Sequence, residues 1–140
     1  MRAVLLFLPL LLTSCALLTP DSGLLDRTWQ VVELQGEPFQ SPTGQAFTLR
    51  LQHDGRMQAY AGCNALTGIY QLKAGRGGQG MLRVGPFDLL EGLCAPDVAR
   101  LERKVIHTME GASSYQLEAD GSLALRNPIQ ITLIRFRARP

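Results

Sequence analysis

Three cysteines, two histidines and a few closely spaced carboxylates are the side chains that could carry chemistry in this 140-residue sequence. A thiol becomes a nucleophile or redox group when a base activates it, and neither His53 nor His107 stands at a spacing that argues for such a base. The histidines also lack an Asp or Glu at ligand spacing, so no metal site or other cofactor is expected. Asp88 and Glu91 are the nearest carboxylate pair for acid–base work, and nothing marks them as buried. The sequence therefore predicts that the protein is not an enzyme.

The N-terminal residues have three features of a bacterial lipoprotein signal. Arg2 supplies a positive charge, and Ala3 to Leu12 form an apolar stretch about half as long as the roughly 20 residues that span a bilayer. Residues 12–15, Leu-Thr-Ser-Cys, resemble the bacterial lipobox, in which small residues precede the acylated cysteine. We expect residues 1–14 to be removed, Cys15 to be acylated, and residues 15–25 to form the acylated N-terminus and tether. The alternative is an ordinary secretory signal cut elsewhere, which would leave Cys15 as an odd thiol.

Acylation at Cys15 would make membrane lipid a partner and place the domain outside the cytoplasm, because two or more acyl chains hold a protein stably in a bilayer. By resemblance to the lipoprotein sorting pattern, Ala16 in place of an aspartate favours the outer membrane, with the domain facing the periplasm. Arg2 is the one charged residue of the signal, so the mature net charge is about +1. That balance gives no electrostatic footprint for nucleic acid, and none is expected as a partner.

The composition of the mature chain favours one small β-rich domain. About 126 residues fall in the single-domain range, and 46% hydrophobic with 19% charged residues is typical of a globular protein. Residues 28–34 predict a first strand that residues 35–38 interrupt. Phe47, Leu49 and Leu51 alternate with polar residues, and Asp54-Gly55 is a turn signal before residues 57–61, so a β-hairpin is predicted here.

The second half of the chain combines further strands with one helix. Strands are expected at 68–73 and 81–84, joined by the glycine-rich residues 75–80; these lack the context of a phosphate-binding loop and favour a hairpin tip. Another hairpin is predicted from 115–117 to 123–125 across Asp120-Gly121, and a last strand at 129–136, with a bulge or a fully buried turn of strand at Leu133-Ile134. A helix is expected from Pro96 to Gly111 on its apolar stripe, Val98, Leu101, Val105, Ile106 and Met109.

Seven or eight short strands and one helix leave two architectures open. The apolar strand faces can be buried between two sheets, or inside a barrel closed on itself with the helix over one opening. A barrel has the advantage of leaving no exposed sheet edge.

Residues 60–64, Tyr-Ala-Gly-Cys-Asn, followed by Gly68-Ile69-Tyr70, resemble the G-x-x-G-C-N…G-x-Y signature of the META/HslJ domain family. The resemblance covers roughly residues 25–136, with further matches at Trp29, Cys94, Glu102 and the late hairpin, and its motif residues here are Gly62, Cys63, Asn64, Gly68 and Tyr70. One departure precedes the helix, where the family's Thr-x-Met-x-Cys is replaced by Leu90-Glu91-Gly92-Leu93-Cys94. Whatever the Thr and Met side chains do in relatives cannot be carried over to this chain.

The resemblance implies a mainly β fold over residues 26–137. That fold is a small lipocalin-like or cracked β-barrel of about seven to eight antiparallel strands with one helix, distantly like lipocalins and the pilot lipoproteins of secretion systems. With Cys15 acylated, Cys63 and Cys94 remain in an oxidising compartment, where a structural disulfide is the expected pairing. The alternative is a redox-active or nucleophilic thiol. Asn64 could orient a ligand or, as favoured here, satisfy backbone groups at a constrained corner.

Two binding functions remain from these observations. The first is a non-catalytic envelope lipoprotein that binds an envelope protein or hydrophobic ligand and maintains the envelope; META/HslJ relatives are linked with stress response and resistance to hydrophobic antibiotics. The second is a lipocalin-like or pilotin-like carrier of an acyl chain or hydrophobic segment. Arg135, Arg137 and Arg139 share one face of the last strand, where they would contact anionic lipid head groups or form a solvated sheet edge.

Overall fold

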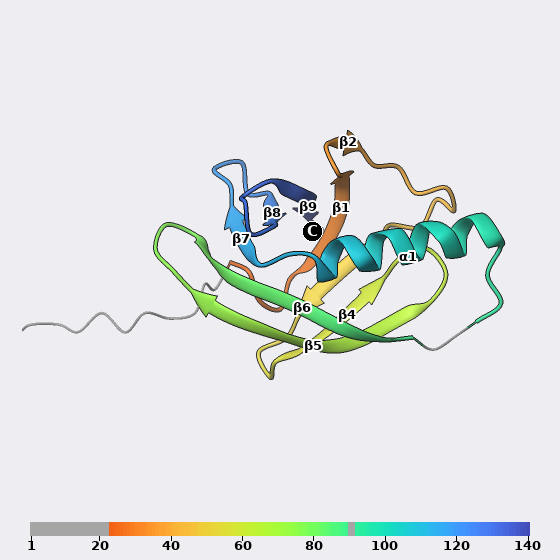
Figure 1. The fold of residues 1–140 in the computed structure, drawn as a ribbon, viewed down its shortest axis with the longest axis horizontal. Coiled ribbons are helices and arrows are strands. Elements are labelled where there is room, and N and C mark those ends of the chain that lie inside the picture. Colours follow the sequence, from red (N-terminus) through yellow and green to blue (C-terminus); the bar gives the residue numbers. More distant parts are fainter. Residues whose placement is uncertain (1–22, 90–91) are drawn as a thin grey trace, which may run out of the picture.

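The computed structural model describes residues 23–89 and 92–140. The expected signal segment, Cys15 and most of the expected tether lie outside these ranges, as do Leu90 and Glu91. The described part of the chain forms nine strands and one helix (Figure 1). In chain order these are β1 (Thr28–Leu34), β2 (Glu37–Pro38), β3 (Thr48–Leu51), β4 (Arg56–Tyr60), β5 (Ala65–Ala74), β6 (Gln79–Leu89), α1 (Pro96–Glu110), β7 (Ser114–Leu117), β8 (Leu123–Arg126) and β9 (Thr132–Ala138).

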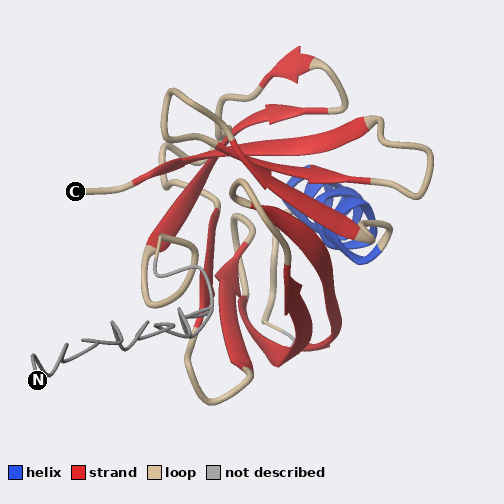
Figure 2. Cartoon of the chain, turned by 90° about the vertical axis from the view of Figure 1, so that its left-hand side faces the viewer, coloured by secondary structure: helices blue, strands red, loops and turns tan. Residues whose placement is uncertain are grey.

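The strands form a closed antiparallel barrel. Neighbours follow the order β1-β3-β4-β5-β6-β7-β8-β9, and β9 pairs back onto β1 through Val31↔Phe136 and Leu34↔Ile134, so eight strands make the ring. The two-residue β2 extends the sheet beside β1 outside the ring. Figure 2 shows the strands curving around a common interior with the helix packed against them. The expected mainly β barrel is confirmed, and the sandwich that the strand pattern had left open does not form.

Alternating side chains fill the barrel interior. Leu49 and Leu51 on β3 are fully buried while Arg50 between them is exposed, which confirms the predicted alternation. The first hairpin pairs Leu51 with Met57, and the late hairpin pairs Tyr115 with Leu125, also as predicted. Large side chains from every part of the ring meet in the core, among them Trp29, Phe47, Met57, Leu66, Leu82, Tyr115, Leu123 and Phe136, all less than 2% exposed. Side chains therefore occupy the interior, as is typical of small barrels.

The helix covers one end of the barrel. Gln35, at the end of β1, lies 3.5 Å from the Thr108 hydroxyl through its Nε2. Phe87 of β6 donates its backbone N–H to Glu110 at 3.4 Å. The predicted stripe is largely confirmed, since Val105, Ile106 and Met109 are buried. Gly111 ends the helix through its N–H on the His107 carbonyl, with a right-handed φ of −74°. Within the described ranges, no helix has the length and hydropathy needed to cross a bilayer.

The segment before β1 closes the opposite end. Leu24 is fully buried, and its carbonyl accepts a 3.0 Å hydrogen bond from the Trp29 indole N–H. Leu25 is also buried, and Asp26 donates its backbone N–H to the Leu51 carbonyl at 2.7 Å. The sequence had placed both leucines in the tether because no strand or helix period runs through them. Leu24 and Leu25 thus pack with the domain, although both were expected to belong to the tether.

The last strand differs from its prediction at its first residues. It begins at Thr132 rather than Ile129, because Asn127 closes a turn in which its side-chain oxygen accepts the backbone N–H groups of Ile129 and Ile131. The predicted bulge is present: Leu125 pairs with Ile134 and Arg126 with Thr132, which leaves Leu133 as the extra residue. The apolar phase shift in the sequence therefore marks a true bulge.

Candidate functional site

The family-like motif forms a tight corner between β4 and β5. Gly62 has a φ of +109°, a conformation that residues with a side chain rarely adopt. A Cβ added at Gly62 would lie 2.5 Å from Cζ of the buried Phe47. Both the backbone conformation and the close approach of the Phe47 ring therefore require glycine at this corner.

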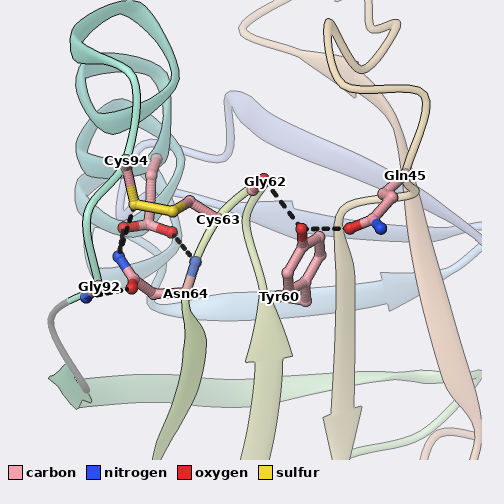
Figure 3. Close-up of a disulfide and its surroundings, with 8 residues drawn as sticks. Gln45, Tyr60, Gly62, Cys63, Asn64, Gly92 and Cys94 are labelled. Atoms are coloured by element: carbon pink, nitrogen blue, oxygen red, sulfur yellow. Dashed lines mark hydrogen bonds between the residues drawn. A yellow bond between two sulfur atoms is a disulfide. The ribbon is translucent and has the colours of Figure 1, made fainter.

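A disulfide joins this corner to the segment before α1. Cys63 and Cys94 are bonded, with their Cα atoms 5.9 Å apart and a sequence separation of 31 (Figure 3). The expected disulfide pairing is confirmed in this structure. Because both sulfurs are oxidised and bonded to each other, neither is a free nucleophile in this state.

Asn64 links the corner to two other segments. Its Nδ2 donates to Oε1 of Glu102 at 2.6 Å, and its backbone N–H donates to Oε2 of the same carboxylate at 2.8 Å. Its side-chain oxygen accepts the Gly92 N–H at 2.8 Å, and Nδ2 also lies 3.3 Å from the Cys94 sulfur (Figure 3). Asn64 therefore satisfies backbone groups as expected, although across 28 residues of sequence instead of within a local turn.

Glu102 is the buried charge at the centre of this network, only 3% exposed in the middle of α1. Both carboxylate oxygens accept hydrogen bonds from Asn64, which compensates for part of the cost of removing the charge from water. Family resemblance pointed to this glutamate without indicating a role for it. The sequence does contain a signal for the burial of Glu102. This residue lies one turn from Val98 and from Ile106, so it shares the inward face of the helix.

The two tyrosines at and after the corner, Tyr60 and Tyr70, donate their hydroxyl groups to backbone carbonyl oxygens. The Tyr60 hydroxyl donates to the Gly62 carbonyl oxygen at 2.9 Å and lies within hydrogen-bonding distance of the Gln45 side chain (Figure 3). The Tyr70 hydroxyl donates to the Gln52 carbonyl. Burial raises the pKa of Tyr70, and the nearby carboxylates of Asp26 and Asp54 raise it further, so the phenol stays protonated and keeps donating at neutral pH.

Gly68 is a position where β5 and β6 approach each other closely. A Cβ there would lie 2.6 Å from the Pro86 carbonyl oxygen and 2.7 Å from Cε of Met57, and the first of these is backbone that cannot move aside cheaply. We expect Gly68→Ala to lower the free energy of unfolding by about 2 kcal/mol, because overpacking forces backbone shifts. Chemical denaturation measures the change.

Gly111→Ala is the matched control for that substitution. Gly111 has a right-handed φ, and a Cβ would meet nothing closer than 3.5 Å. Alanine should leave stability unchanged or raise it by up to about 1 kcal/mol, since it restricts the unfolded chain. Equal losses for the two variants would contradict the close approach at Gly68.

The structure does not bring the other candidate groups together. His53 lies on the exposed β3–β4 turn with Nε2 2.8 Å from an Asp26 carboxylate oxygen, and His107 is exposed on α1. Asp88 is exposed at the end of β6, and its proposed partner Glu91 lies outside the described residues. Across residues 23–89 and 92–140, no group of three or more His, Cys, Asp or Glu is arranged to hold a metal ion. The corner at Cys63 can hold segments together, but it presents no free base beside a free nucleophile.

The arginines of the last strand require a correction. β9 is paired on both sides, with β1 and β8, so the expected solvated sheet edge is wrong. Arg135 lies 3.5 Å from a carboxylate oxygen of Glu33 and 3.6 Å from one of Glu118, with about 30% of its side chain exposed. Arg137 is exposed on the strand and Arg139 follows its end. Closure of the barrel turns the expected edge into an interior strand, which no local pattern could indicate.

Comparison with known proteins gives a family match and three related folds. Residues 22–140 match the sequence model of the META domain. The fold resembles the NMR structure of a protein from Burkholderia xenovorans, with a TM-score of 0.59 and 20% identity over 86% of this chain and 90% of that one. It also resembles the crystal structure of a DUF4847 family protein from Bacteroides vulgatus, with a TM-score of 0.55 and 17% identity over 81% and 93%. No curated protein matches the sequence. At these identities the solved structures establish a shared fold alone.

Proposed function

Because this chain belongs to the META domain family, we propose that it is a non-catalytic envelope lipoprotein, anchored through Cys15, whose barrel binds an envelope partner and helps maintain the envelope under stress. The observation that supports this function most directly is the use of the motif's polar side chains. Both oxygens of Glu102 accept hydrogen bonds from Asn64, and Cys63 is bonded to Cys94. These groups stiffen a scaffold and are not free to act on a substrate.

The filled interior supports a binding surface over a carrier cavity. A site for an acyl chain needs several hundred cubic ångströms of apolar space. Trp29, Phe47, Tyr115 and Phe136 occupy the interior of this barrel, each at most 1% exposed. A carrier would have to displace these side chains to admit a chain, whereas a partner can bind the outer surface of the barrel as it stands.

The proposed anchor is argued from the sequence before Gly23. Its position limits how far the domain can lie from the membrane. Gly23 follows Cys15 by eight positions, and eight steps of 3.3–3.6 Å span at most about 28 Å. A membrane protein or lipid head group within that reach is therefore the kind of partner that this domain would meet.

Metabolic labelling with a radioactive fatty acid tests the anchor. We expect label in the wild type and in the double variant C63S/C94S, and none in Cys15→Ser, because acylation consumes only the Cys15 sulfur. The mass of the N-terminal peptide should show the corresponding lipid. An unlabelled wild-type protein would show that the signal is processed elsewhere and would overturn the anchor.

Native mass spectrometry of the purified protein separates partner binding from carriage. The proposal expects no acyl chain held inside the barrel, together with an envelope protein recovered by cross-linking in intact cells. A fatty acid or other acyl chain without a phosphate-bearing head group, held non-covalently at near one-to-one, would overturn it in favour of the carrier. A strain lacking the gene should lose resistance to hydrophobic antibiotics, and wild-type protein should restore it while Cys15→Ser does not.

A further inference from the structure

A cationic pocket lies between the β5–β6 turn and the outer faces of β7 and β8. Its volume is about 400 Å³. Four of its lining residues form a row in which each is paired with the next across neighbouring strands. Lys73 pairs with Met81, Met81 with Ser114, and Ser114 with Arg126. Arg76, on the β5–β6 turn, adds a third cation to the lining. The pocket is thus built from four neighbouring strands and not from one mobile loop.

The charges of this pocket are poorly compensated. Its lining includes no Asp or Glu. Within the described ranges, no carboxylate lies within 4.0 Å of the charged nitrogens of Lys73 or Arg76. Arg126 donates from Nη2 to Glu118 at 3.0 Å, but its Nε is buried without a hydrogen-bond partner. Lys73 and Arg76 are therefore the two cations of this pocket that are exposed and lack a carboxylate partner among the described residues.

Apolar surface lies beside these cations. Met81, near the start of β6, is 52% exposed. In this row of paired residues, Lys73 lies on one side of Met81. Ser114 and then Arg126 lie on the other side. A ligand that combines an anionic group with an adjoining apolar part would satisfy both kinds of surface, whereas a small inorganic anion would leave Met81 exposed.

The pocket lies at the end of the barrel where the chain enters. A Cβ on Gly23 would be 3.5 Å from Cδ1 of Leu117, and one on Gly78, at the β5–β6 turn, would be 3.3 Å from Cβ of the same leucine. Figure 1 shows the start of the described chain on the same side as the β5–β6 turn and β7, away from the first turn of α1. A tether of at most about 28 Å from Cys15 would therefore hold the cationic turn towards the membrane surface.

We propose that this pocket binds the phosphate-bearing head group of an anionic phospholipid in the membrane that anchors Cys15. This inference rests on the proposed anchor for its source of lipid. Lys73 and Arg76 attract the phosphate, and Met81 contacts the glycerol and first methylenes. Basic pockets at a membrane surface recognise anionic head groups by the same combination of charge and position. Binding would fix the orientation of the barrel, with α1 facing away from the bilayer.

Amide hydrogen exchange of the mature full chain in vesicles tests the proposal. Three preparations are compared: phosphatidylcholine alone, an equal mixture with phosphatidylglycerol, and phosphatidylcholine with added inorganic phosphate. We expect exchange in residues 75–80 to slow about tenfold in the phosphatidylglycerol mixture only, because a bound head group holds the turn closed. The intact mass of the same sample reports acylation, so failure of the anchor is seen separately from failure of the pocket.

Paired double variants identify the residues responsible. K73Q/R76Q should remove the protection, while R103Q/K104Q, which has the same change in charge on exposed positions of α1, should retain it. Both pairs are exposed, and equal unfolding midpoints would show that both variants fold. Three outcomes would each overturn the proposal: equal protection in phosphatidylcholine alone, equal protection by inorganic phosphate, and protection that survives in K73Q/R76Q.

Discussion

Replacing Cys63 and Cys94 together by serine is expected to lower the free energy of unfolding by about 3.5 kcal/mol. The disulfide closes a loop with a sequence separation of 31, and on the chain-entropy account the cross-link stabilises by removing disorder from the unfolded state. The double variant also loses the 3.3 Å contact between the Asn64 amide and the Cys94 sulfur. Denaturant unfolding under oxidising conditions measures the difference directly.

Two controls separate the cross-link from the serines. Wild-type protein treated with a reductant should lose nearly as much stability as C63S/C94S, and the variant itself should not respond to the reductant. Cys15→Ser should unfold like the wild type, since Cys15 belongs to the expected tether and precedes Leu24, the first buried residue in the described part of the chain. Unfolding curves that stay unchanged on reduction would show that the bond contributes nothing to the domain.

Replacing Glu102 by alanine should cost about 3 kcal/mol. The substitution leaves the Nδ2 and the backbone N–H of Asn64 without their Glu102 acceptors at a partly buried corner, and it opens a cavity beneath α1. Glu102→Gln should cost less, because one oxygen remains, while its amide nitrogen faces a second donor. Arg103→Ala, at an exposed position next in the helix, is the matched control and should change stability little.

A double-mutant cycle tests whether Asn64 and Glu102 act as one unit. Asn64→Ala and Glu102→Ala remove opposite sides of the same hydrogen bonds, so the double variant should lose clearly less stability than the two single losses added together. Strict additivity would mean that the two side chains stabilise the fold independently. It would also remove the reason for assigning the motif asparagine a structural role.

The disulfide and the Asn64–Glu102 hydrogen bonds also matter for the shape of the barrel's outer surface. The disulfide and the Asn64–Glu102 pair hold the same three segments, namely the β4–β5 corner, the segment at Gly92 to Cys94, and α1. A barrel held this way keeps its outer surface in a fixed shape, which favours binding because little order has to be gained on contact. Stability and surface geometry are therefore linked through the motif, even though the cationic pocket lies elsewhere on the barrel.

Local pattern was sufficient to predict most elements. The period-two alternation at residues 47–51, the Asp54-Gly55 and Asp120-Gly121 turns and the apolar stripe from Val98 to Met109 depend on neighbours a few residues away. Each reappears in the structure as a strand, a hairpin or a helix face. The bulge at Leu133 belongs with them, because one extra residue changes which side chains face inward along a single strand.

The candidate site was predictable only in part. Resemblance to a family pointed to the glycine, cysteine and asparagine at 62–64, to Cys94 and to Glu102. It did not indicate that Asn64 reaches across 38 residues to a buried carboxylate, since that contact exists only after α1 packs over the barrel end. The cationic pocket was missed for the same reason: Lys73, Ser114 and Arg126 are far apart in sequence and become neighbours through strand pairing.

The sequence by itself determined the mainly β class of fold and the positions of the hairpins and the helix, because backbone propensity and apolar periodicity act over short distances along the chain. Resemblance to a family supplied the motif residues. Only the tertiary structure decided that β1 and β9 close the ring, that Leu24 belongs to the core, and that Arg135 pairs with carboxylates inside a sheet instead of facing solvent at its edge. Those outcomes depend on which distant segments become neighbours. That choice is made by the summed burial of the whole core, to which no single stretch of sequence contributes enough to reveal it.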